Sequence, residues 1–291
     1  MNTSTWHRFP DVHSFLARAG DFLRSRPVPH TVPLTVCEGL RARGPRVYGD
    51  EAPVFGVLEQ DGEVRAAYFR TPPHRLVVTP LAPEEAGSLA AHLHAVGDPV
   101  PGVNADEATA AAFAEAWRAR TGTAPRLHER TRLYRLGELR RPEPAPEGRS
   151  RIADGQDRGL LARWYAEFVR DIGESGLQDP GAWADRHIAD RRITFWETPG
   201  GVPVSMAGLT ALVAGQIRVA AVYTPAALRG RGYAGAATVE AGLAALAEGA
   251  EEVLLFADLA NPTSNGVYQR VGFRPVTDFA VYDLAAAAVP G

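Results

Sequence analysis

The chain has 291 residues, enough for one or two domains with a sizeable core. Apolar residues make up 45% of it and charged residues 22%, which is the balance of an ordinary globular protein. The formal net charge of −3 disfavours binding to bulk nucleic acid or to an anionic membrane, because both attract basic surfaces. A single cysteine, Cys37, excludes an internal disulfide framework.

Two further features bear on where the protein works. Residues 1–10 contain no apolar signal core, and no stretch approaches 18 uncharged apolar residues. We therefore expect a cytoplasmic protein with no membrane or nucleic-acid partner. Monomer and homodimer both remain open.

The first half of the chain shows helical and strand patterns in succession. Apolar residues of 11–26 recur at helical spacing behind Asp11, a suitable helix cap, and Asp61-Gly62 between two apolar runs indicates a hairpin. In order, we predict helices at 11–26 and 31–43, strands at 54–59, 64–70 and 75–79, helices at 83–96 and 106–122, and a strand at 126–136.

A charged, proline-rich segment at 140–148 divides the chain. Its composition is typical of a stiff linker, so we predict domains at 1–139 and 149–291. The second half is predicted to contain a strand at 151–153, helices at 156–172 and 180–189, strands at 193–197, 202–212 and 215–223, a helix at 231–248, a strand at 252–258, a helix at 263–271, and strands at 273–275 and 279–284. This order predicts an α+β fold with helices on both faces of a mixed sheet.

The turn between the strand at 215–223 and the long helix reads Arg229-Gly230-Arg231-Gly232. Glycines let backbone N–H groups converge with no Cβ in the way, and the helix N-terminus behind them is positively polarised. The arginines add charge-assisted donors. Such a turn can hold a diphosphate, although a plain surface turn can have the same composition. Its spacing is neither that of a Walker loop nor that of a dinucleotide-binding loop.

A second segment runs from Asn261 to Tyr268 and leads to Gly272-Phe273. Together, the two segments resemble the cofactor half of the GNAT-superfamily acyl-coenzyme A N-acyltransferases. The turn matches the family's Arg/Gln-x-x-Gly-x-Gly/Ala loop at Arg229, Gly232 and Ala234. The second segment matches Asn-x-x-Ala-x-x-x-Tyr-x-x-x-Gly-Phe at Asn261, Ser264, Tyr268, Gly272 and Phe273. The resemblance spans residues 149–284.

This resemblance implies a GNAT fold and an acyl-CoA co-substrate, with acetyl-CoA as the expected one and no metal. The residues that it assigns to CoA binding are Val222, Tyr223, Thr224, Arg229, Gly230, Arg231, Gly232, Tyr233, Ala234, Asn261, Ser264 and Tyr268. A backbone N–H near Val222 and Tyr223, where two parallel strands would splay apart, is expected to polarise the thioester carbonyl. Tyr268 stands where the family places its general acid, but it could instead simply pack on the sheet. Asn261 could equally cap a helix.

The general base is harder to assign. Many members of the family carry a glutamate on the strand that leads to the turn, but 216–223 contains no carboxylate. Asp258 and Glu197, each at a strand end, are the candidate bases, and either could instead be a solvated strand end. An amine of low pKa would need no base.

The first half of the chain echoes the second. The stretch 77–81 resembles 222–226, and each precedes a helix. In the first half, Pro80-Leu81-Ala82-Pro83 offers no converging N–H groups, because proline has none. We therefore predict two tandem GNAT-like domains, of which the N-terminal one is degenerate and does not bind CoA.

The sequence as a whole predicts an acyl-CoA-dependent N-acyltransferase that transfers its acyl group directly to an amine in a ternary complex. The amine acceptor could belong to a small metabolite, an antibiotic or a peptide. The alternative is a non-catalytic GNAT-like module that senses an acyl-CoA or a peptide.

Overall fold

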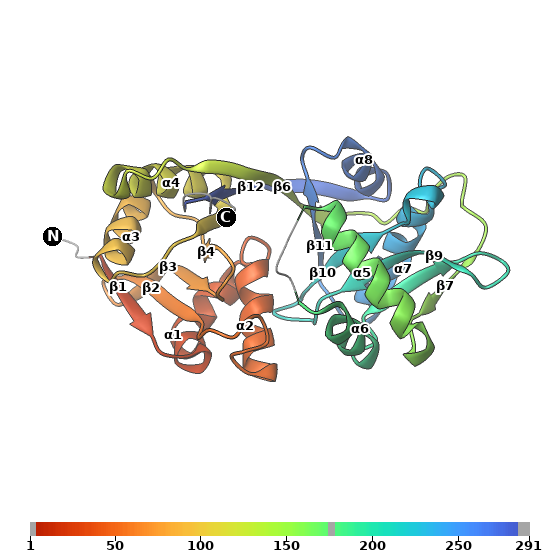
Figure 1. Ribbon diagram of the computed structural model, residues 1–291, viewed down its shortest axis with the longest axis horizontal. Helices are drawn as coiled ribbons and strands as arrows, with labels where there is room; N and C mark the ends of the chain where they lie inside the picture. Colours follow the sequence, from red (N-terminus) through yellow and green to blue (C-terminus); the bar gives the residue numbers. More distant parts are fainter. Residues whose placement is uncertain (1–3, 174–177, 285–291) are drawn as a thin grey trace, which may run out of the picture. The chain divides into compact units, whose positions relative to one another are not determined.

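The computed structural model describes residues 4–173 and 178–284, which form two compact units (Figure 1). Of the described residues, unit 1 comprises 4–133, 258–260 and 277–284, and unit 2 comprises the remainder. None of the described helices is long and apolar enough to cross a membrane.

Unit 1 contains the first ten helices and strands in chain order. They are β1 (Thr5–Phe9), α1 (Val12–Ser25), α2 (Thr31–Arg43), β2 (Val54–Gln60), β3 (Glu63–Arg70), β4 (Leu76–Val78), α3 (Pro83–Ala95), β5 (Gly102–Asp106), α4 (Glu107–Thr121) and β6 (Arg126–Leu136), whose last residues belong to unit 2. The strand order in this unit is β1-β2-β3-β4-β5, followed by the end of a strand from the C-terminus of the chain.

Unit 2 follows the same plan. Its elements are β7 (Arg149–Ile152), the 3₁₀ helix η1 (Gly155–Asp157), α5 (Arg158–Asp171), α6 (Pro180–Ala189), β8 (Ile193–Glu197), β9 (Pro203–Leu209), β10 (Gln216–Tyr223), the 3₁₀ helix η2 (Ala226–Leu228), α7 (Tyr233–Ala247), β11 (Glu252–Asp258), α8 (Pro262–Arg270) and the start of β12 (Phe273–Asp283). Its strands lie in the order β11-β10-β9-β8-β7. Apart from the two short 3₁₀ helices, β-α-α-β-β-β-α-β-α-β describes each half of the chain, in agreement with two tandem copies of one fold.

The sheet of unit 2 is covered on both faces, as predicted. Helices α5 and α6 pack on one face, with Trp164 and Trp183 buried against Phe195 and Met206. Helix α7 packs on the other face. Its sequence is rich in alanine and nearly uncharged, so almost any of its faces can be buried, and the small side chains allow a close approach to the strands.

The boundary between the units differs from the predicted one. Residues 273–283 form one continuous strand, β12, and its second part pairs antiparallel with β5 from Phe279↔Asp106 to Asp283↔Gly102. An ion pair of 2.8 Å between Arg75 and Asp283 fastens the same end. Residues from Thr277 onward therefore belong to unit 1, because a strand belongs to the sheet that supplies its hydrogen bonds.

The proline-rich segment at 140–148 lies within unit 2 and packs along α7 rather than spanning a gap between domains. Arg141 pairs with Glu240 of α7 at 2.6 Å, and Trp196 of β8 donates its indole N–H to the Glu147 carbonyl at 3.2 Å. Composition alone suggests a linker, but a proline-rich segment also packs well where no ladder hydrogen bonds are needed.

Two short strands had no clear signal in the sequence. β1 has one buried side chain, Trp6, and is an edge strand beside β2. β5 consists of Gly-Val-Asn-Ala-Asp, a composition that disfavours strands, and is held by β4 on one side and β12 on the other. In both cases the strand depends on its neighbours rather than on local propensity.

Candidate active site

The two central strands of unit 2 diverge at one end. β10 and β11 pair in parallel from Gln216↔Glu252 to Val219↔Leu255, and both then continue, β10 to Tyr223 and β11 to Asp258. The backbone groups beyond Val219 are thus not used for pairing between these two strands. A strand edge opened in this way can bind an extended amide chain by β-augmentation.

A β-bulge lies in the diverging part of β10. Against β9, the pairing shifts from Ala220↔Gly208 to Tyr223↔Met206, so that Ala221 and Val222 together oppose Ala207. Ala221 takes a left-handed backbone conformation with φ of +50°. That conformation is uncommon for a residue with a side chain, and bulges of this kind redirect the side chains that follow them.

After β10, the chain turns through η2 and enters α7 with open backbone donors. Gly230 and Gly232 have φ of +77° and +81°. Gly232 is the N-cap of α7, so the cap residue has no side chain that could accept a hydrogen bond from the first turn. The first helical bond runs from the Ala236 N–H to the Gly232 carbonyl. The N–H groups of 233–235 therefore have no acceptor within the helix, and a Cβ added at Gly230 would meet nothing within 4 Å. An anion fits such an opening.

Arg229 is engaged within the protein rather than aimed at this opening. Its guanidinium bonds the Asp171 carboxylate at 2.5 Å and the Thr224 carbonyl at 2.9 Å, and it lies 5.9 Å from the centre of the Tyr223 ring. Its predicted contact with the cofactor has to compete with these bonds. Arg231 is exposed, and its guanidinium lies 3.5 Å from the Ala227 carbonyl, so it is the more available cation.

Thr224 has an internal role in addition to the predicted one. The Ser205 hydroxyl donates to the Tyr223 carbonyl at 3.0 Å and lies 2.8 Å from the Thr224 hydroxyl, which therefore donates to it. Thr224 is buried, so this pair fixes the end of β10 against β9. Val222 and Tyr233 are half-buried beside the α7 core, and Ala234 belongs to the first turn of that helix.

Tyr268 lies on α8 and is buried in the same core as α7. Its ring meets Phe273 edge-on with centroids 6.3 Å apart. Burial raises the pKa of the Tyr268 phenol to about 12, so the hydroxyl keeps its proton across the physiological range. A phenol in that state can act as a proton donor and not as a base.

The start of α8 is capped by its own sequence. The Asn261 side chain accepts the Ser264 N–H at 3.0 Å, which is the capping alternative considered above. Asn265 accepts the Tyr134 hydroxyl of β6 at 2.6 Å, and Gln269 donates to the same hydroxyl at 3.2 Å. These bonds fix α8, and with it Tyr268, against β6.

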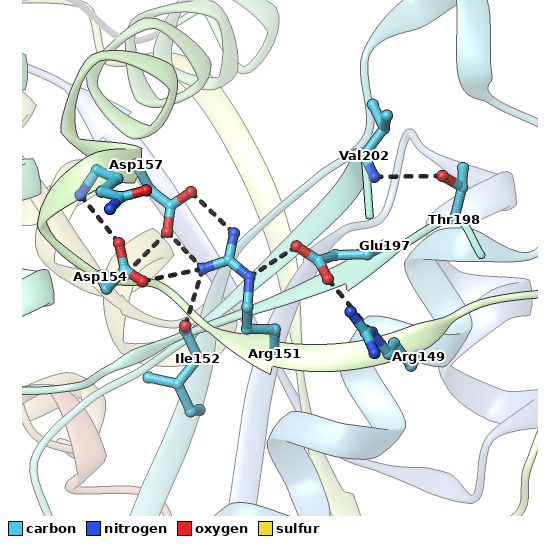
Figure 2. Close-up of polar contacts among 9 residues, drawn as sticks. Arg149, Arg151, Ile152, Asp154, Asp157, Glu197, Thr198 and Val202 are labelled. Atoms are coloured by element: carbon cyan, nitrogen blue, oxygen red, sulfur yellow. Dashed lines mark hydrogen bonds and ion pairs between the residues drawn. The ribbon is translucent and has the colours of Figure 1, made fainter. Parts of the chain in front are cut away.

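The two candidate bases have other partners. Asp258 accepts the Ala260 N–H at 2.8 Å and belongs to unit 1. Glu197 is buried at the end of β8, where Arg151 bonds it at 2.6 Å and Arg149 approaches to 3.6 Å (Figure 2). Glu197 is thus neither a solvated strand end nor an unpaired carboxylate, because the basic residues of β7 neutralise it.

The same arginine also fastens the start of α5. Figure 2 shows the Arg151 guanidinium between Glu197 and Asp157, with bonds of 2.6 and 2.9 Å to the two Asp157 oxygens. The hydrogen bonds from Arg151 lower the pKa of the Asp157 carboxyl. The first turn of α5 is therefore tied to β7 and β8 through charge.

We expect Asp157→Asn to lower the free energy of unfolding by about 2 kcal/mol at pH 7, since it weakens charge-assisted bonds at a carboxylate only 11% exposed. The lowered pKa means that this contribution is present above the ordinary aspartate pKa and is lost as the pH falls below about 4. Urea unfolding at pH 7 and at pH 3.5 measures both effects. Asp185→Asn breaks an exposed pair with Arg158 and should lower the free energy of unfolding much less than Asp157→Asn does; equal losses in the two variants would contradict the role given to Asp157.

The corresponding turn of unit 1 is closed. The Leu81 N–H donates to the Thr109 hydroxyl at 2.9 Å, and the Ala82 N–H donates to the Glu85 carboxylate at 2.8 Å. Pro80 and Pro83 have no N–H, and Glu85 lies in the first turn of α3. These are the features expected of a copy that does not hold an anion.

Two residues that sequence reasoning did not single out face the end of β10. Glu167 of α5 accepts the Tyr223 hydroxyl at 2.8 Å, and Asp171, one helical turn further on, holds Arg229. In the sequence, these two residues are four positions apart and lie on the same face of the helix as the inward-facing Trp164. Without the fold, nothing indicated what this face contacts. Among the described residues, no group of three or more His, Cys, Asp or Glu is arranged to hold a metal ion.

Comparison with known proteins identifies the fold. No protein-family model and no curated protein sequence matches the chain. Solved structures do: an acetyltransferase of the GNAT family from Colwellia psychrerythraea has a TM-score of 0.62 at 11% identity, covering 97% of this chain and 100% of its own. A GCN5-related N-acetyltransferase from Sphaerobacter thermophilus has a TM-score of 0.61 at 17% identity, covering 96% and 94%.

A third match is with a protein described as tandem. A tandem GNAT protein from the clavulanic acid biosynthesis pathway has a TM-score of 0.59 at 12% identity, covering 98% of this chain and 100% of that one. The chain therefore has the GNAT fold, as its two motifs predicted, and the likeness extends over both halves.

Proposed function

We propose that the chain is an acyl-CoA-dependent N-acyltransferase, with acetyl-CoA as the expected donor and unit 2 as the place of transfer. The observation that carries the proposal is the start of α7, where N–H groups with no acceptor inside the helix follow two glycines of positive φ in the turn after β10. A diphosphate bound there would leave the pantetheine arm to run into the divergence between β10 and β11.

The residues of this chain then have distinct tasks. Backbone N–H groups of the bulged part of β10 polarise the thioester carbonyl, as in an oxyanion hole. The lone pair of the amine attacks that carbonyl, and the Tyr268 phenol gives its proton to the departing sulfur. No covalent enzyme intermediate is needed. The lone cysteine, Cys37, is fully buried in unit 1, and burial raises the pKa of its thiol to about 12, so it is not a nucleophile.

Two measurements on the purified full chain test the proposal. Calorimetric titration with CoA tests binding, and release of free thiol from acetyl-CoA over a panel of small amines, amine antibiotics and peptides tests transfer. We expect binding, and thiol release with at least one acceptor class. Binding of CoA without release from any amine would fit the sensor alternative, and absence of CoA binding would overturn both.

A further inference from the structure

The bulge in β10 changes which face of the sheet Tyr223 reaches. Ile217 and Val219 lie in the α7 core, and regular alternation would send Tyr223 to the same face. The extra residue at Ala221–Val222 reverses the alternation, so that Tyr223 lies in the core beneath α5 and α6. A residue in an unfavourable left-handed conformation thus lies where it directs one phenol toward α5.

The surroundings of that phenol are specific. Its hydroxyl donates to Glu167 at 2.8 Å, and its ring lies 6.0 Å from that of Trp164. The charged groups around it are Glu167 and Asp171 of α5 and Arg229 of the turn. Burial first, and then the bond to Glu167, raise the pKa of Tyr223 to about 12, so the phenol is protonated at rest. The hydrogen bond therefore runs from the phenol to the carboxylate.

We propose, resting on the proposed function, that Tyr223 and Glu167 together accept the proton of the amine substrate and replace the carboxylate that β10 lacks. Tyr223 is the group that touches the nitrogen, and Glu167 acts through it. Glu197 does not compete for this task, because two arginines hold it. The assignment also defines the acceptor class as a basic amine, which arrives as an ammonium ion and must lose a proton before it can attack.

The ammonium gives one proton to the Tyr223 oxygen while the Tyr223 proton passes to Glu167, which leaves a neutral amine and a neutral carboxyl. The nitrogen lone pair forms the C–N bond, and the C–S bond breaks with its electron pair on sulfur. Sulfur takes the Tyr268 proton, and the second proton lost by nitrogen returns to Tyr268 through water. Glu167 then releases its proton to solvent, so the net products are amide, thiol and one H⁺.

The test compares two acceptors that differ in basicity. The best primary alkylamine of the panel is used beside its O-alkylhydroxylamine analogue, whose nitrogen is already neutral at pH 7. Glu167→Gln keeps an oxygen that can accept the Tyr223 hydroxyl but cannot take its proton. We expect kcat/KM for the alkylamine to fall about 100-fold, and for the hydroxylamine less than about 10-fold. A purely structural role would lower both values equally, and that result would overturn the inference.

Two further variants keep the test decisive. Tyr223→Phe retains the ring against Trp164 and should show the same dependence on acceptor basicity, even if Glu167→Gln folds poorly. Glu248→Gln makes the same chemical change at an exposed ion pair with Arg192, at the far end of α7, and should leave both rates unchanged. Wild-type protein that binds CoA but acylates neither acceptor would overturn the proposed function itself. An active wild type whose Glu167→Gln variant loses both rates equally would overturn only the proton-accepting pair.

Discussion

Replacement of Tyr268 by phenylalanine is expected to lower kcat at least about 100-fold while changing the Kd for CoA less than about threefold. The reason is that the variant keeps the buried ring against Phe273 and removes only the proton that the leaving sulfur needs. Steady-state thiol release gives kcat, and calorimetry gives Kd.

A matched control is available on the other face of the same unit. Tyr165 is also buried, and it stacks on Trp183 with centroids 4.0 Å apart. Tyr165→Phe makes the same change outside the candidate site and should leave kcat within about twofold. If Tyr268→Phe turned over at the wild-type rate, Tyr268 would be a packing residue only, and the proton for sulfur would have to come from water.

Replacement of Gly232 by valine is expected to raise the Kd for CoA at least about 100-fold, because losing two charge-assisted bonds to phosphate removes about 3 kcal/mol or more. Gly232 has φ of +81°, which a β-branched residue adopts only with strain, so the variant chain has to move the N–H groups that follow. A Cβ at this position would also lie 3.7 Å from Pro146, which limits where the turn can move.

The effect of backbone strain in Gly232→Val has to be distinguished from the loss of the proposed anion site. Gly249 lies just past the other end of α7, with φ of +97° and nothing within 4 Å of an added Cβ. Gly249→Val therefore imposes similar backbone strain at a place where the N–H groups of residues 249–252 are already hydrogen-bonded, and CoA affinity should not change. Circular dichroism confirms that both variants are folded. Tight CoA binding by Gly232→Val would show that the anion binds elsewhere.

Much of unit 2 could be read from local sequence. Pro225 stops a β-rich run, Gly230 and Gly232 allow a turn that other residues resist, and the alanine-rich stretch after them favours a helix. These are properties of single residues and near neighbours, so the strand, the turn and the helix were predicted in place. The pattern of the two motifs then indicated the GNAT fold, which the solved structures share.

Other features depend on contacts between distant residues. No local pattern predicts that β5 is a strand or that the end of β12 belongs to unit 1. Both features depend on the antiparallel pairing of β5 with β12. Contacts between distant residues also explain why Arg229 and Glu197 differ from their predicted roles. Arg229 pairs with Asp171 and Glu197 pairs with Arg151, each on another element.

The sequence by itself determined that a glycine-bearing turn would lie between a strand and a long helix, since backbone conformation there is set by which residues have a Cβ. Only the tertiary structure decided which side chains surround that turn. A bulge of one residue sends Tyr223 to the face covered by α5, where Glu167 receives its hydroxyl. The face of the sheet that a side chain reaches depends on the register of its strand against the neighbouring strand, and that register is fixed only when the strands pair.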